Sequence, residues 1–200
     1  MADAILDVME LYVRVGDLVK RNDMASLFKS VLKLAEARMF RTLRIGAMET
    51  VASLTPDANG NIPLPPDLLE IRYVATVDGD LTGMSPGAIS SRYGRSGGNG
   101  RAYSVAGNML SIRPLGAQAA EIVYYARPES LTVVPTNAVL SAAPDVYLYG
   151  VAREAAVNAR DPALVGMLDP LYTQAVQAVE LEDLSRRFGT QSVRLIGPTP

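Results

Sequence analysis

Hydrophobic residues in this chain change their spacing twice, and that change limits the possible folds more than any other feature. Over residues 1–48 and again over 144–189, apolar side chains recur every three or four positions, which is the period of one face of an α-helix. Between these segments, over 49–143, short runs rich in β-branched residues and tyrosine alternate with turn residues. The chain is therefore predicted to be α+β, with a helical bundle built from its N- and C-terminal helices and a small antiparallel β-sheet inserted between them.

Two helices are expected before residue 48. The first covers 2–20, and its predicted apolar side consists of Ile5, Val8, Met9, Tyr12, Val15 and Val19. The second begins at Asn22 or Asp23, either of which can cap it, and continues to Leu43. Along it, five bases accompany the single acid Glu36: Lys29, Lys33, Arg38, Arg41 and Arg44. A solvated face that meets acids elsewhere is favoured over a nucleic-acid contact, because no aromatic or strand pattern is interleaved with the bases.

In the inserted region, strands are expected at 51–54 and 70–77, with a turn at 56–60 before the second one. Three further runs follow, and their short connections predict an antiparallel meander: 102–105, 109–113 and 121–126. The sequence LTVVP, at 131–135, is another strand-like run.

The helical period returns at Pro144, which begins a helix of about four turns ending near Arg160. Asp161 and Pro162 then give the cap and first residue of a last helix, which Gly189 ends. An internal Asp169-Pro170 predicts either a kink or a second start. Two pairs at four-residue spacing are expected as exposed ion pairs: Glu182 with Arg186, and Asp183 with Arg187. The tail, 190–200, holds a strand-like core at 192–196.

Composition excludes much of ordinary enzyme chemistry. The 200 residues contain no cysteine and no histidine, which removes disulfides, thiolate metal sites and the commonest general base. The net charge of −2 gives no global basic field to attract nucleic acid. Since the chain has no apolar run of about 18 residues and its N-terminus is acidic, we expect a soluble protein that is not exported and does not contact a membrane.

The glycine-rich stretch SRYGRSGGNGRAY, at 91–103, is the best candidate for a phosphate-binding loop, and it fails two tests. A Walker-type loop needs a lysine, but none follows Lys33. A dinucleotide fingerprint needs a third glycine where Tyr103 stands and a helix where a strand is predicted. We therefore expect a glycine-rich connection over 78–101.

Carboxylates also gather at two places, Asp78/Asp80 and Glu180/Glu182/Asp183. The first pair brackets a turn glycine and the second group lies at a charged helix end, so both are interpreted as solvated. No catalytic, metal or cofactor site is predicted.

Five segments follow one another in a distinctive order: LAEARMFRTLRIGAMET, NIPLPPDLLEIRYV, RAYSVAGNMLSIRP, AEIVYYARPESLT and YLYGVAREAAVNARDPALV. This order resembles that of the head-to-tail adaptor, or connector, proteins of tailed bacteriophages, of the short-tailed type. The resemblance covers about residues 20–185. It depends on the order of the elements, since no single motif is diagnostic.

The resemblance implies a structural virion protein and not an enzyme. Such adaptors form a ring, of twelve copies in the virion, that docks under the portal protein, extends the channel for double-stranded DNA and gives a tail or nozzle protein its platform. The protein would thus be made in the cytoplasm of the bacterial host and located at the head–tail junction. A near-neutral charge suits a channel through which a duplex must slide.

The resemblance also assigns a portal-binding segment, carried over to Ser192, Val193, Arg194, Leu195 and Ile196. An alternative for this segment is a strand that closes the protein's own sheet. Arg92, Arg95 and Arg101 are expected in a loop that faces either the lumen or the tail protein. Two other functions stay open: a wall-degrading hydrolase, which would need converging carboxylates, and a soluble partner-binding module unrelated to virions.

Overall fold

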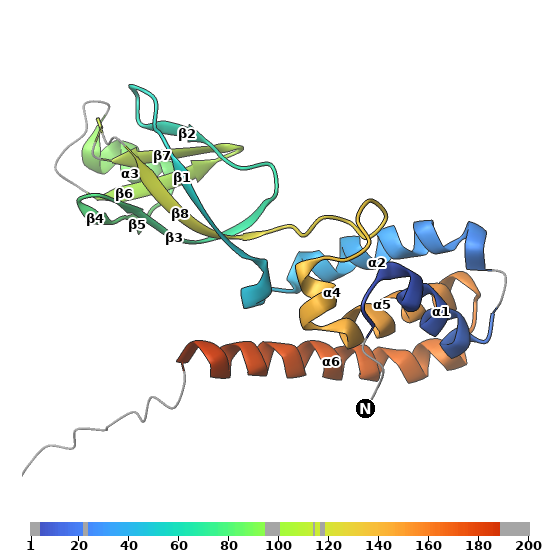
Figure 1. Cartoon of the computed structure of the whole chain (residues 1–200). Helices are drawn as coiled ribbons and strands as arrows, with labels where there is room; N and C mark the ends of the chain where they lie inside the picture. The colour runs from blue at the N-terminus through green and yellow to red at the C-terminus, as the bar shows by residue number, and fades with distance from the viewer. Residues whose placement is uncertain (1–4, 22–23, 95–100, 114, 117–118, 189–200) are drawn as a thin grey trace, which may run out of the picture. The chain divides into compact units, whose positions relative to one another are not determined.

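The chain forms two compact units, here called the helical unit and the sheet unit (Figure 1). In this computed structural model the described residues are 5–21, 24–94, 101–113, 115–116 and 119–188. The helical unit combines the chain up to Ala47 with the chain from Glu129 onward, and the sheet unit is Met48–Pro128. Helices lie N- and C-terminal to the strands, so the predicted α+β class is confirmed.

In the helical unit, α5 is the central helix because it packs against α1, α2 and α6. Its side chains Val146, Tyr147 and Val151 are fully buried. The elements of this unit are α1 (Val8–Val19), the 3-10 turn η1 (Met24–Ser26), α2 (Phe28–Thr42), α4 (Ala138–Ala142), α5 (Pro144–Asn158) and α6 (Pro162–Phe188). A second 3-10 turn, η2 (Gly46–Met48), joins α2 to the sheet unit.

The first helix is shorter than expected, and its buried side agrees with the predicted one at Val15 and Val19 but not at Met9. It begins after Asp7, whose carboxylate accepts hydrogen bonds from the backbone N–H groups of Met9 and Glu10. Its buried residues are Leu11, Val15 and Val19. The assignment of Met9 to the buried side was wrong, because this side chain is 66% exposed.

The second helix also differs at its start. A 3-10 turn precedes α2, and Leu27, which makes no side-chain capping bond, occupies the cap position. The expected capping residues, Asn22 and Asp23, lie outside the described residues. From Phe28 on, α2 has the predicted apolar face, with Val31, Leu32, Ala35 and Met39 buried.

The two C-terminal helices agree well with the sequence. α5 begins at Pro144, and α6 is one continuous helix that contains Pro170. The expected ion pair of Glu182 with Arg186 is present and exposed. The Asp183–Arg187 pair is present but largely buried, so the expectation that both pairs are exposed was wrong for this one.

A buried carboxylate joins α2 to the rest of the helical unit. Glu36 is 5% exposed, and its oxygens accept hydrogen bonds from the Ser130 hydroxyl at 2.5 Å, the Leu131 N–H at 2.8 Å and the Tyr147 hydroxyl at 3.3 Å. Burial raises the pKa of Tyr147 well above its ordinary value, so its phenol keeps the proton that it donates. Three donors offset the cost of burying one charge.

This carboxylate explains why LTVVP is not a strand. The backbone N–H of Leu131 bonds to Glu36, and the N–H groups of Val133 and Val134 bond to the carbonyl of Ser130. The run therefore forms turns, and its β propensity is overridden by bonds to a distant helix.

A second set of contacts lets α5 cross close to α2 and α6. Arg38 of α2 pairs with the buried Glu154 of α5 at 2.6 Å. One turn earlier, a Cβ on Gly150 would lie 3.2 Å from the ring of Tyr172 and 3.3 Å from the sulfur of Met39. Any larger residue at this position would force the Tyr172 ring or the Met39 side chain to shift by a few tenths of an ångström.

The sheet unit holds two four-stranded sheets. The first has the order β1-β8-β3-β4, and the second β2-β7-β6-β5. All pairs are antiparallel except β5 with β6, which are parallel. The strands are β1 (Glu49–Leu54), β2 (Asn61–Pro63), β3 (Leu68–Thr76), β4 (Gly79–Asp80), β5 (Thr82–Gly83), β6 (Ala102–Ala106), β7 (Met109–Arg113) and β8 (Ala120–Ala126).

Apolar side chains from both sheets form one core. Val74, Ile122 and Tyr124 come from the first sheet, and Ile62 and Leu110 from the second. Tyr125 points to the opposite face from Tyr124 along β8. There the guanidinium of Arg72 lies 5.7 Å from the centre of its ring.

The predicted meander was wrong. β6 and β7 form a hairpin, but β2 takes the other edge of β7, and β8 lies between β1 and β3 in the other sheet. β8 has a paired strand at each edge, and most of its side chains are buried or half-buried, which agrees with its near-continuous apolar run. Pro63 ends β2 at the sheet edge, where a missing N–H is tolerated.

The segment 78–101 is not simply a glycine-rich connection. It contains β4, β5 and the helix α3 (Pro86–Tyr93), capped by the Ser85 hydroxyl, which accepts from the N–H of Ala88. α3 packs against β6 and buries Ile89. Residues 95–100, with three of the seven glycines of the segment, lie outside the described residues.

We predict that Glu36→Gln destabilises the protein by roughly 1–3 kcal/mol. Each carboxylate oxygen of Glu36 accepts a hydrogen bond, and in glutamine one of these oxygens is replaced by an NH₂ group, which cannot accept. Thermal unfolding followed by circular dichroism measures the effect. The matched control is Glu129→Gln, an exposed position whose effect should stay within about 0.5 kcal/mol. Equal melting temperatures for the two variants would show that the Glu36 hydrogen bonds contribute nothing.

Candidate functional site

A row of apolar side chains faces solvent just before and along α1. Leu6, Met9 and Val13 are 70%, 66% and 55% exposed. Leu6 lies just before the helix, and the four-residue spacing of Met9 and Val13 puts both of these on one side of α1. Scattered exposed apolar residues are normal on a protein surface, but a contiguous row marks a contact surface. We call these three residues the α1 row.

A second exposed apolar row lies on α6. Of the side chains described in this 27-residue helix, two are buried, Leu168 and Ala175. Met167, Leu181 and Leu184 are at least half exposed and lie on one side of the helix, since Met167 precedes Leu181 by about four turns. These three residues are the α6 row. Most other apolar side chains of α6, such as Leu171 and Val179, are half-buried, so the helix packs one side on its own unit and leaves this row outward.

The sequence carried a signal for both rows that periodicity alone missed. α1 is apolar on more than one side, because Met9 and Val13 accompany the buried Leu11 and Val15. Such a helix is either buried all round or packed on a second surface. Because only one apolar side was assigned to each helix, the second apolar side was missed.

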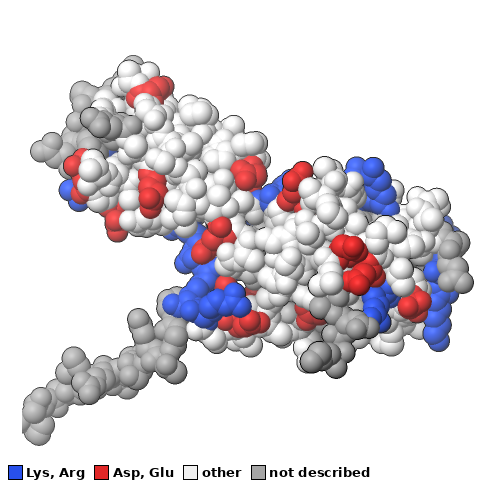
Figure 2. Space-filling model, viewed as in Figure 1, with Lys and Arg blue, Asp and Glu red and all other residues white. Residues whose placement is uncertain are grey.

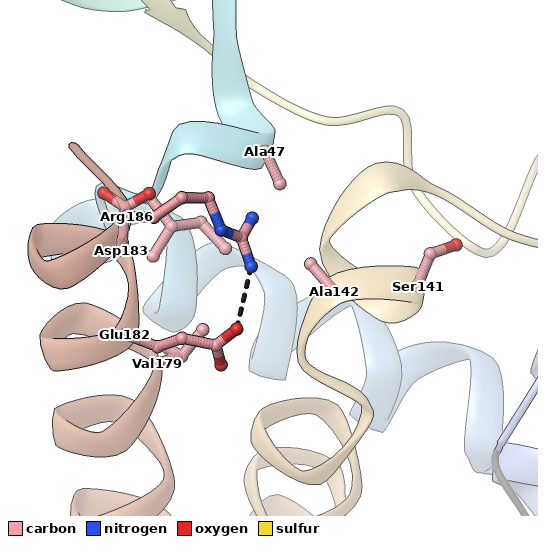
Figure 3. Close-up of a pocket in the computed structure, with 8 residues that line it drawn as sticks. Ala47, Ser141, Ala142, Val179, Glu182, Asp183 and Arg186 are labelled. Atoms are coloured by element: carbon pink, nitrogen blue, oxygen red, sulfur yellow. Dashed lines mark hydrogen bonds and ion pairs between the residues drawn. The ribbon is translucent and has the colours of Figure 1, made fainter. Parts of the chain in front are cut away.

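A small pocket lies beside the last turns of α6, and Figure 3 shows the residues around it. It has a volume of about 240 Å³. Its apolar wall consists of Ile45, Ala47, Ala142 and Val179. Across its charged side, Arg186 pairs with Glu182 at 2.7 Å. An apolar wall beside charged side chains is typical of a surface that contacts another protein.

Asp183 ties the end of α6 to the segment after α2. One carboxylate oxygen accepts the backbone N–H of Gly46 at 2.8 Å, and the other pairs with Arg187 at 2.6 Å. A Cβ on Gly46 would lie 2.5 Å from the first oxygen, so the contact needs glycine there. The C-terminal end of α6 is thereby fixed within the helical unit.

The predicted portal-binding residues, Ser192, Val193, Arg194, Leu195 and Ile196, lie outside the described residues, as does Arg95. Arg92 is on the last turn of α3, with its guanidinium 5.7 Å from the ring centre of Tyr93. Arg101 precedes β6, and its carbonyl accepts the N–H of Thr82. Both arginines are exposed on the sheet unit.

The carboxylates singled out in the sequence have other partners. Asp80 accepts from the hydroxyl of Tyr73 at 2.6 Å, and this bond raises the pKa of Tyr73. Glu182 and Asp183 pair with arginines, as described above. Over the described ranges, no three acidic side chains gather as they would around a metal ion. No described helix has the length and apolar character needed to cross a membrane.

We predict that Asp183→Ala loosens the end of α6, because it removes the acceptor of Gly46 and leaves the largely buried Arg187 without this carboxylate. The cost should be roughly 1–3 kcal/mol. Amide hydrogen exchange over 180–188 measures the local effect. Glu182→Ala, which breaks the exposed pair nearby, is the control and should cost less than about 0.5 kcal/mol. Unchanged exchange in Asp183→Ala would mean that α6 is held by its apolar contacts alone.

Comparison with known proteins gives one informative result. No curated protein matches the sequence significantly. A family model described as "SU10 adaptor protein" matches residues 5–194, which includes both units and both apolar rows. The chain therefore belongs to the SU10 adaptor protein family, and it is a structural adaptor protein of a bacteriophage.

Proposed function

We propose that the protein assembles into a ring beneath the portal of a short-tailed phage, extends the DNA channel and presents the platform on which a tail or nozzle protein docks. The ring has twelve copies and is located at the head–tail junction of the virion, after synthesis in the cytoplasm of the bacterial host. Membership of the adaptor family favours this function over a module unrelated to virions.

The helical unit exposes two different apolar rows, and this observation carries the proposal. A closed ring is built from heterologous contacts, in which one face of a subunit meets a different face of the next. The α1 row and the α6 row lie on separate helices, both of which pack on α5. We assign the α1 row of one copy to the α6 row of its neighbour. Each copy then covers both of its apolar rows, which no isologous dimer of either row would do.

The portal contact is proposed from the order of segments along the chain. α6 ends at Phe188, two residues beyond the pocket residue Arg186, and the segment Ser192–Ile196 follows it in the sequence. We propose that the segment binds the portal protein by adding a strand or by lying in a groove. Arg92, Arg95 and Arg101 belong to the sheet unit, and we assign them to the lumen or to the tail protein. Double-stranded DNA passes through this lumen without sequence preference.

The ring contact predicts the effect of placing a charge in either row. Met9→Glu and Leu181→Glu should each abolish ring formation on the portal, because a carboxylate would be buried against apolar side chains. Sedimentation with the portal ring of the same phage measures this. Val77→Glu is the control, since Val77 is 90% exposed in a turn of the sheet unit. Rings that form normally with both Glu variants would contradict the assignment of the rows.

The portal contact predicts the effect of removing the tail. A chain ended after Phe188 should keep its fold, because every described contact of α6 is retained, but should not sediment with the portal ring. Full-length protein is the control and should sediment with it in a fixed ratio. If the shortened chain binds equally well, the anchor lies in the helices. If neither chain binds at low or moderate salt, the adaptor ring itself is the wrong proposal.

A further inference from the structure

The outer face of α2 is basic and has no acid. Along this helix pairs of buried residues alternate with pairs of exposed ones. The exposed residues are Lys29, Ser30, Lys33, Leu34, Ala37, Arg38, Arg41 and Thr42. The only acid of the helix, Glu36, is buried on the opposite side, where it accepts three hydrogen bonds. The expected solvated face with compensating acids is therefore only partly present.

Three of the four bases have no partner within the part of the chain that the structure describes. Arg38 pairs with Glu154. Lys29, Lys33 and Arg41 form no hydrogen bond or ion pair with another described residue. We call these three residues the basic row. In Figure 2, basic atoms lie over the part of the helical unit where Figure 1 draws α2.

The composition of this face does not suit a protein partner. Protein interfaces are depleted in Lys, Ser and Ala, and their strongest contacts come from Trp, Tyr and Arg. The face has Lys, Ser and Ala at half of its positions, and Leu34 is its one large apolar side chain. It differs in this respect from the α1 row and the α6 row.

The same composition suits contact with the phosphate groups of a nucleic acid that moves along this face. A lysine ammonium is a compact, strongly hydrated charge on a flexible stem, and it meets a phosphate without the fixed two-bond geometry of arginine. Lys29 and Arg41 are twelve residues apart, which is about 18 Å along a helix and enough to reach several phosphates of one duplex. Contacts of this kind neutralise charge without fixing a register.

We propose that the basic row, Lys29, Lys33 and Arg41, faces the phosphates of double-stranded DNA. The choice of DNA as the source of the phosphates rests on the proposed function, in which the ring surrounds a duplex. The row assigns this contact to the helical unit, whereas Arg92 and Arg101 would assign it to the sheet unit.

Binding of a fluorescent random-sequence duplex, measured by anisotropy over a range of salt concentrations, tests the proposal. The full-length protein should bind weakly, with an affinity that falls as salt rises. In the triple variant Lys29→Gln/Lys33→Gln/Arg41→Gln, the slope of log affinity against log salt should become shallower by roughly 0.9 for each phosphate that is no longer neutralised. Glutamine is nearly as good a helix former as lysine and arginine, so the variant should melt at the same temperature as the unaltered protein.

The matched control is Arg92→Gln/Arg101→Gln, which removes exposed bases from the sheet unit. With DNA assigned to the basic row, these two arginines are left to the tail protein, so this variant should leave the slope unchanged. A slope that falls only in this control would overturn the proposal and give the contact to the sheet unit. So would the absence of any salt-dependent binding by the unaltered protein.

Sedimentation of the triple variant with the portal ring separates this inference from the proposed function. The variant should still sediment with the portal, because the basic row is not part of the ring or portal contacts. If it loses portal binding while its salt slope stays unchanged, the row binds a protein and the DNA assignment is wrong. If the unaltered protein fails to bind the portal, the ring proposal fails independently of the DNA result.

Discussion

The buried carboxylate of Glu36 is the interaction on which the helical unit most depends. It joins α2 to the turns at Ser130 and Leu131 and to Tyr147 of the central helix. Burying a charge is costly unless hydrogen bonds compensate it, so the three donors must stay in place together. Two of the five segments in the adaptor-like order meet here: LAEAR contains Glu36 and Arg38, and YGVAREA contains Gly150 and Glu154. Their shared task is the packing of α2 on α5.

The helices around α5 also have outward surfaces. α1 and α6 both pack on α5, and each leaves an apolar row exposed. The outer face of α2 instead carries three bases that have no partner among the described residues. The helical unit thus has two surfaces with the composition of protein contacts and one with the composition of a polyanion contact.

The sequence predicted the fold class and most helices because their signals are local: period, proline starts such as Pro144 and Pro162, and the four-residue pairs of α6. The sequence-based prediction was wrong where contacts between residues far apart in the chain determine the local structure. β8 joins β1 and β3 instead of β7, and Leu131–Val134 turns because Glu36 binds it. For the site, Arg92 and Arg101 could be named but not given partners. The α1 row was missed because Met9 was assigned to the buried side, and spacing alone does not tell a buried apolar residue of a helix from an exposed one.

The proposed ring depends on the α1 row of one copy meeting the α6 row of the next. The chain has no cysteine, so Met9→Cys/Leu181→Cys places the only two thiols of the protein at the two proposed sides of that contact. Oxidation of this variant on the portal ring, followed by denaturing electrophoresis without reductant, is the most direct measurement. We expect a ladder of covalent oligomers that neither single variant gives. Dimers alone, or an uncrosslinked chain in rings that have formed, would contradict the contact between the two rows.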